Sequence, residues 1–156
     1  MVRLLLLCLA LTACAPSGGE LASAATGLSG SYSRQVVISD HPHHVLYGHV
    51  VDITDGQDRT RALIVSQRRD GVHRLRLNEA WADGRSLPYR RMNRRLGCTH
   101  GHCRNDAVGM ILLGEGMINR SARNGLGASL IGPEGRIDIY APPGLFTALM
   151  APPQQT

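Results

Sequence analysis

The chain has 156 residues, of which 17 are basic and 12 acidic, so its formal net charge is +5; 43% of the residues are hydrophobic. Every basic residue is an arginine, which excludes functions that depend on a lysine, such as Schiff-base chemistry or a P-loop phosphate site. This length and composition are typical of one globular domain rather than a disordered chain.

Residues 1–14 have the pattern of an export signal. Arg3 supplies a positive charge, residues 4–11 form an apolar run, and Leu11-Thr12-Ala13-Cys14 ends it. An apolar run of this length is too short to cross a bilayer as a helix, but it has the length of a signal-peptide core. We therefore predict that residues 1–13 are a leader outside the fold.

Leu11-Thr12-Ala13-Cys14 resembles the lipobox of bacterial lipoproteins, in which small residues precede an invariant cysteine. The resemblance implies cleavage after Ala13 and acylation of Cys14, so that lipid anchors an exported protein to the cell envelope. Because Ala15 and not aspartate follows Cys14, it also implies the outer membrane, facing the periplasm. Ordinary cleavage after Ala22-Ser23-Ala24 is the alternative.

The next segment, residues 14–33, is rich in alanine, glycine and serine and carries one charge. Such a composition buries little apolar area, so we predict a lipid anchor followed by a flexible tether. The globular domain is then expected over residues 34–156.

Within that domain the apolar residues mostly alternate with polar ones, as in half-buried strands. Strands are predicted at 43–53 and 60–67, joined by a turn at Asp55-Gly56, and a third strand at 72–77 completes an antiparallel meander. Residues 107–113 are apolar on both faces and predict a central strand. A helix at 115–124 ending at Gly125, a hairpin of 126–131 with 136–140, and one or two helical turns in 144–150 follow. The expected fold is mainly β, a single antiparallel domain forming a sandwich or small barrel with one or two short helices.

Cys98 and Cys103 are the two thiols left once Cys8 is removed with the leader and Cys14 is acylated. In an exported protein we expect them to form a disulfide, and four intervening residues allow the required approach. The alternatives are a metal site with His100 or His102 and a redox pair, but the spacing matches neither a zinc motif nor CxxC.

Five of the seven histidines fall into two groups. One group contains His41, His43 and His44, and the other contains His100 and His102. Imidazole suits copper and zinc, so a metal site built from both groups is the alternative functional hypothesis. The other interpretation is a polar entrance to a strand, and no cofactor is then required.

Residues 68–95 concentrate the positive charge, because nine arginines against three acidic residues give this segment +6. Arginine forks bind phosphate and carboxylate groups. The predicted anion-binding residues, to which Arg85 adds a further charge, are Arg68, Arg69, Arg74, Arg76, Arg90, Arg91, Arg94 and Arg95. The alternative is an ordinary solvated surface.

The sequence carries none of the common catalytic signatures, such as G-x-S-x-G or H-E-x-x-H. A cell-wall hydrolase therefore has no paired motif in its support, and an extracytoplasmic address disfavours nucleic acid as a partner. We predict a non-enzymatic envelope lipoprotein whose arginine-rich face contacts an anionic lipid, lipopolysaccharide or an envelope protein.

Overall fold

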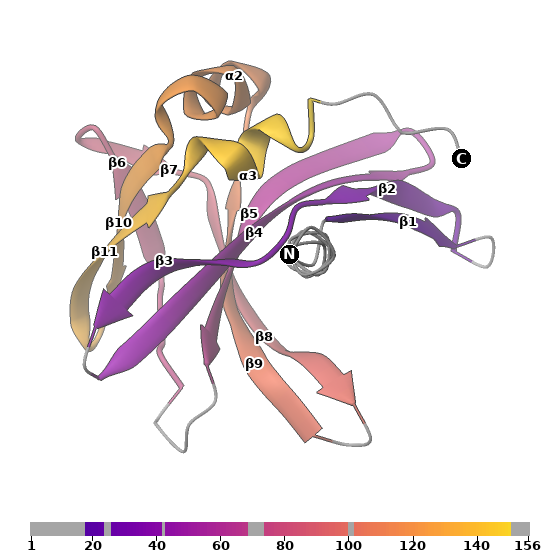
Figure 1. Cartoon of the computed structure of the whole chain (residues 1–156). Helices are drawn as coiled ribbons and strands as arrows, with labels where there is room; N and C mark the ends of the chain where they lie inside the picture. Colours follow the sequence, from indigo (N-terminus) through magenta and orange to yellow (C-terminus); the bar gives the residue numbers. More distant parts are fainter. Residues whose placement is uncertain (1–17, 24–25, 42, 69–73, 100–101, 151–156) are drawn as a thin grey trace, which may run out of the picture.

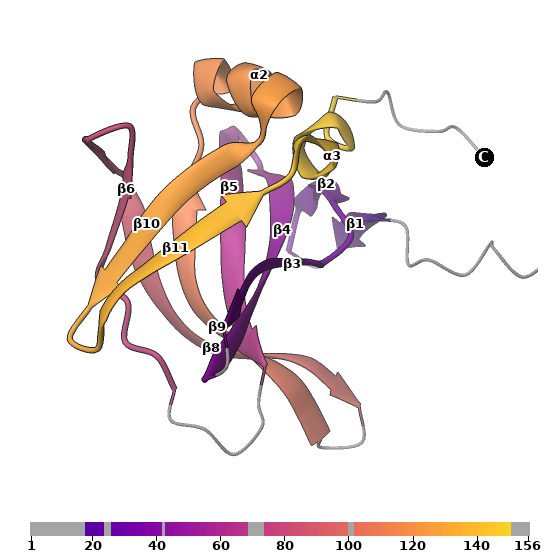
Figure 2. The same cartoon turned by 60° about the vertical axis from the view of Figure 1, so that its left-hand side comes forward.

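The computed structural model describes residues 18–23, 26–41, 43–68, 74–99 and 102–150, with the side chains of residues 96–104 outside the description. Eleven strands and two helices are assigned in these ranges, and the strands form two antiparallel sheets (Figures 1 and 2). In chain order the elements are β1 (Gly19–Ser23), β2 (Leu28–Tyr32), β3 (Val36–His41), β4 (His44–Asp55), β5 (Asp58–Arg68), β6 (Glu79–Ala82), β7 (Arg85–Leu87), β8 (Tyr89–Thr99), β9 (His102–Leu112), α2 (Glu115–Asn124), β10 (Leu126–Gly132), β11 (Gly135–Ala141) and α3 (Pro143–Thr147).

The larger sheet has the order β1-β2-β4-β5-β9-β8, and β3 also pairs with β4. One edge of β4 pairs with β5 over residues 46–55. The other edge is shared, because β2 pairs with residues 51–55 and β3 with residues 44–48. Ser33 joins the two partners: its N–H donates to the Val50 carbonyl (2.8 Å), and its Oγ accepts from the Val50 N–H (2.8 Å). The chain thus passes from β2 to β3 without leaving this edge.

The predicted tether is wrong for residues 19–23 and 28–32. β1 and β2 form a hairpin within this segment, and β2 extends the larger sheet through its pairing with β4. Ser33, at the end of the predicted tether, is buried. Alternating small residues can pair through their backbones when a neighbouring strand offers a free edge. Composition alone does not show that such an edge exists. Cys14 and the leader lie outside the described residues.

Short turns at glycines fix the hairpin registers. Asp55 pairs with Asp58, so the loop between β4 and β5 has two residues and begins at Gly56 with φ +59°. This confirms the predicted turn. Asp83 and Gly84, between β6 and β7, both have positive φ, which is the conformation of a type I′ hairpin turn. The hairpin of β10 and β11 is confirmed as well.

The strand predicted at 72–77 is wrong in its described part, because residues 74–78 cross from the larger sheet to the smaller one. β9 occupies the second edge of β5, so no edge remains for a third meander strand. Backbone N–H groups of this crossing segment bond to a side chain and to the smaller sheet. Gln67 Oε1 accepts from the Leu75 N–H (2.9 Å), and the Asn78 N–H donates to the Ile131 carbonyl (2.8 Å). The alternating Leu75 and Leu77 instead point into the core.

The main core lies between the two sheets. β4, β5 and β9 supply one wall, and the smaller sheet, with the order β11-β10-β6-β7, supplies the other. α2 and α3 close one end with Ile118, Leu145 and Phe146 (Figure 1). The helix predicted at 115–124 is confirmed with its stop at Gly125, whose φ is +77°. The mainly β prediction with two short helices is confirmed, and the sheets do not close into a barrel.

A second, smaller apolar cluster lies on the opposite face of the larger sheet. Its buried members are Val51, Ala62, Ile64 and Ala107. The odd-numbered residues of β4 contribute to this face, while Leu46 and Val50 point into the main core. Apolar residues on both faces make β9 an inner strand between β5 and β8, as predicted.

Candidate anion-binding surface

Four of the eight predicted anion-binding residues lie on β8. This strand forms one edge of the larger sheet and pairs with β9. Arg90, Arg91, Arg94 and Arg95 are all exposed. Successive strand residues point to opposite faces, and a register shift falls between Arg91 and Arg94, so the four guanidinium groups project from both sides of the edge.

Tyr89 fixes the beginning of this strand. Its ring lies directly over Gly109 on β9, where a methyl group in place of the glycine hydrogen would overlap the ring. The hydroxyl donates to the Val108 carbonyl (3.3 Å), and burial raises the pKa of Tyr89 to about 12. The arginines that follow Tyr89 therefore extend from a strand whose first residue is fixed by packing.

Arg74 reaches the same strand from the crossing segment. Its guanidinium donates to Asn93 Oδ1 and to two backbone carbonyls, those of Ala107 (2.7 Å) and Arg94 (3.4 Å). None of these partners carries a charge, so Arg74 adds to the positive field of β8. We call Arg74, Arg90, Arg91, Arg94 and Arg95 the β8 surface.

No residue of the β8 surface forms an ion pair with another described residue. The remaining predicted arginines lie elsewhere. Arg68 ends β5 and pairs in register with Asn105. The backbone of Arg76 runs beside Gly132 at the hairpin of β10 and β11, and Arg85 belongs to β7. Arg69 lies outside the described residues. The continuous +6 segment of the sequence is thus divided among separate parts of the fold.

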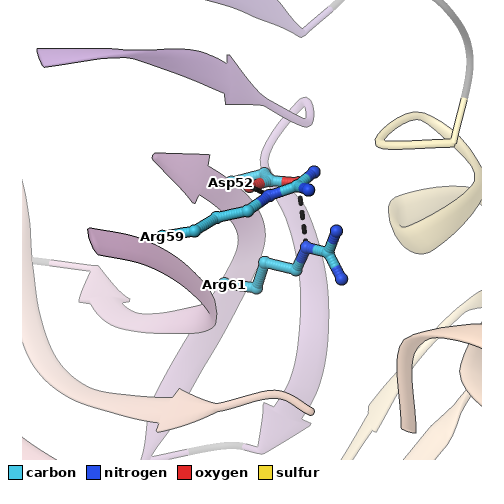
Figure 3. A network of polar contacts seen from close by, with 3 residues as sticks. All are labelled: Asp52, Arg59 and Arg61. Carbon is cyan, nitrogen blue, oxygen red and sulfur yellow. Dashed lines mark hydrogen bonds and ion pairs between the residues drawn. The ribbon is translucent and has the colours of Figure 1, made fainter. Parts of the chain in front are cut away.

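A contrasting arginine cluster lies on β4 and β5, and sequence inspection did not select it (Figure 3). Arg59 donates to both carboxylate oxygens of Asp52 (2.8 and 2.7 Å), and Arg61 Nε donates to Oδ2 (3.1 Å). Asp52 is buried, and the hydrogen bond from Arg59, with the charges of both arginines, lowers its pKa. The two-residue turn was the available signal, since it sets Asp52 opposite Arg61.

The first histidine group comes together at the turn between β3 and β4. The rings of His41 and His44 stack at 4.7 Å with nearly parallel planes, and the ring of His43 lies 5.4 Å from that of His41. Burial, followed by the nearby His41 and His43, lowers the pKa of His44. Among the described residues, no group of three or more potential ligands forms a metal site.

The position of the second histidine group relative to the first is not described, because His100 and the side chain of His102 lie outside the described residues. The backbone register sets Cys98 directly opposite Cys103. Opposed residues of antiparallel strands have Cα atoms about 4.5–5.5 Å apart, within the range of a disulfide. Their side chains are not described, so the disulfide stays a prediction.

Comparisons with known proteins give no assignment: no family model, no curated protein and no solved structure matches this chain. In the part of the chain that the structure describes, no helix combines the length and apolarity needed to cross a bilayer.

Proposed function

We propose that the protein is a non-enzymatic lipoprotein of the cell envelope, anchored through Cys14, whose β8 surface binds an anionic envelope component. The observation that carries this proposal is the β8 surface itself, where none of the five guanidinium groups forms an ion pair with a described residue, although Asp106 lies opposite Arg95 in the register. Arginine forks that are not neutralised within the protein remain available for phosphate or carboxylate groups.

The chain geometry supports a domain held close to its anchor. Five residue steps separate Cys14 from Gly19, the first residue of β1, and they span at most about 18 Å. The tether expected over residues 14–33 would have reached several times farther.

The sheet order favours a soluble polyanion over the anchoring bilayer as the ligand. β1 and β8 form opposite ends of the strand path, five strand spacings apart. At about 4.8 Å each, these spacings separate the anchored edge from the β8 surface by up to about 24 Å. A separation near this upper limit exceeds the Debye length of about 8 Å at physiological ionic strength, and headgroups beneath β1 would then attract β8 only weakly.

The test uses the purified lipidated protein in nonionic detergent, with inorganic polyphosphate as one probe and phosphatidylglycerol vesicles as the other. The triple variant Arg90→Gln, Arg91→Gln and Arg94→Gln is expected to bind polyphosphate at least about tenfold more weakly and with a smaller salt dependence. Its midpoint of urea unfolding should stay close to that of the wild type, since these side chains are exposed.

A second triple variant controls for net charge. Arg34→Gln, Arg123→Gln and Arg136→Gln remove the same charge from exposed positions outside the β8 surface. This variant should keep polyphosphate binding within about twofold of the wild type. Equal losses in both triple variants would show that binding follows net charge and would reject the β8 surface. Tighter binding to vesicles than to polyphosphate would reject the soluble polyanion.

A further inference from the structure

A groove on the smaller sheet joins two adjacent hollows, one of about 640 Å³ and one of about 520 Å³. The first lies between the hairpin of β6 and β7, the C-terminal half of α2 and the start of β10. The second lies on the face of the smaller sheet where Trp81 is exposed (Figure 2 shows α2 beside β10 and β6). Ala82, Asp83 and Gly127 line both hollows, so the two adjoin at these residues.

The α2 end of the groove combines an apolar floor with positive charge. Leu87, Met117 and Leu126 line this hollow together with the exposed Arg85 and Arg120. Neither arginine forms an ion pair with another described residue. Asp83 lines the same hollow, so the two guanidinium groups leave it a net charge of +1, which favours a ligand that carries a carboxylate or phosphate group.

The other end combines an aromatic ring with fixed polar groups. Trp81 is 36% exposed, and its Nε1 donates to Glu79 Oε2 (2.9 Å), which orients the ring. Nearby, Asp138 Oδ1 accepts hydrogen bonds from Ser129 Oγ (2.6 Å) and Arg136 Nε (2.8 Å). An oriented indole face offers a stacking surface, while the hydroxyl and the carboxylate offer hydrogen bonds to a ligand's hydroxyl groups.

Gly127 keeps the floor of the groove open where the hollows meet. A Cβ atom built on this residue would meet nothing within 4 Å, and its φ is not positive, so neither space nor backbone conformation requires glycine here. Glycine inside a strand lowers stability and often marks the close approach of a ligand. Tyr140 lies opposite Gly127 and is 53% exposed, which adds a second aromatic side chain beside the open floor.

We propose that this groove binds an acidic saccharide. One sugar ring stacks on Trp81 with its hydroxyl groups directed to Ser129 and Asp138, and the chain crosses the open position at Gly127. A carboxylate or phosphate group of a neighbouring sugar pairs with Arg85 and Arg120. This site is separate from the β8 surface and does not depend on it.

Trp81 is the single tryptophan of the chain, so its fluorescence reports directly on this groove. The lipidated protein in detergent is titrated with a hyaluronan tetrasaccharide, which carries uronate groups, and with a neutral chitin tetrasaccharide. We expect a saturable change of Trp81 emission with the acidic sugar, at an affinity at least fivefold higher than for the neutral sugar. An absent response to hyaluronan, or a tighter response to a nucleotide such as AMP, would overturn the proposal.

Two variants test the parts of the site. Gly127→Val fits the strand and fills the groove, so it should weaken hyaluronan binding at least tenfold while the melting temperature stays the same or rises. Gly116→Ala, an open position on α2 outside the groove, is the matched control and should bind as the wild type does. Arg120→Gln should remove most of the preference for the acidic sugar. Unchanged binding in Gly127→Val, or an unchanged preference in Arg120→Gln, would contradict the site.

Discussion

The two arginine clusters of the larger sheet place the same side chain in opposite electrostatic settings. On β4 and β5, Arg59 and Arg61 share one buried carboxylate, which lowers the charge of the two arginines from +2 to a net +1 (Figure 3). On β8 none of the arginines forms an ion pair with a described residue, although Asp106 lies opposite Arg95 in the register. The first cluster is therefore expected to act on stability, and the second on binding.

Removing the acid from the paired cluster should have the largest effect. Asp52→Ala leaves the half-buried Arg61 without its partner and is expected to lower the free energy of unfolding by about 3 kcal/mol, as measured by urea denaturation. The control is Asp138→Ala, which breaks the exposed pair with Arg136 and should cost less than about 0.5 kcal/mol. Similar losses in both variants would contradict the role of burial.

Lowering the pH should lower the stability of the fold and leave binding by the β8 surface unchanged. Of the two arginine clusters, only the one around Asp52 contains a titratable acid. Burial lowers the pKa of His49 below 6.5, so the unfolded chain binds that proton first and stability falls as the pH drops below about 6.5. The slope from one group is at most about 1.4 kcal/mol per pH unit. Asp52, whose pKa is lowered, adds stability that is present above pH 3.8 and is lost as the pH falls through its native pKa.

Urea midpoints measured from pH 8 to pH 3 check this order. His49→Leu should flatten the decline near neutrality and leave the acidic one in place, with the remaining slope due to His44, whose pKa is also lowered. Polyphosphate binding by the β8 surface should stay constant from pH 8 to pH 5, because arginine does not titrate there. A steep change of binding in that range would contradict the assignment to arginines.

The smallest effect is expected from adding an acidic side chain to the β8 surface. Asn93→Asp places a carboxylate where Arg74 already donates a hydrogen bond, which should add about 0.2–1 kcal/mol of stability. The same change should weaken polyphosphate binding about two- to threefold, as measured by calorimetry. Asn119→Asp on the exposed face of α2 makes the same charge change and should leave binding unaltered.

Local sequence signals predicted the elements that depend on neighbours in the chain. The turn at Gly56, the helix ending before Gly125 and the hairpin of β10 and β11 each follow from a short motif whose backbone preference needs no distant partner. The same motifs contained the paired cluster, because the two-residue turn fixes which residues of β4 and β5 face each other. Charge counting passed over it, since Arg59 and Arg61 lie outside the dense segment.

The remaining features depend on contacts between distant residues. Whether residues 19–23 and 28–32 form strands depends on the free edge of β4, and whether residues 74–78 form one depends on β9 having taken the edge of β5. The groove joins β6, β7, α2 and β10, and no pattern within any one of them indicates its neighbours. Arg85 and Arg120 are 35 positions apart in the sequence, and only the fold places them around one recess.

The hairpin of β1 and β2 has a mechanical consequence. Gly19, where the chain enters, pairs with Tyr32, directly before the buried Ser33. A pull on the N-terminal end would therefore open β1 from β2 like a zipper, one residue pair at a time, and then peel β2 from β4 in the same way. Ser33, held by two hydrogen bonds to Val50, would stop the opening. About 14 residues would be released, enough to extend the chain by roughly 50 Å while the core stays folded.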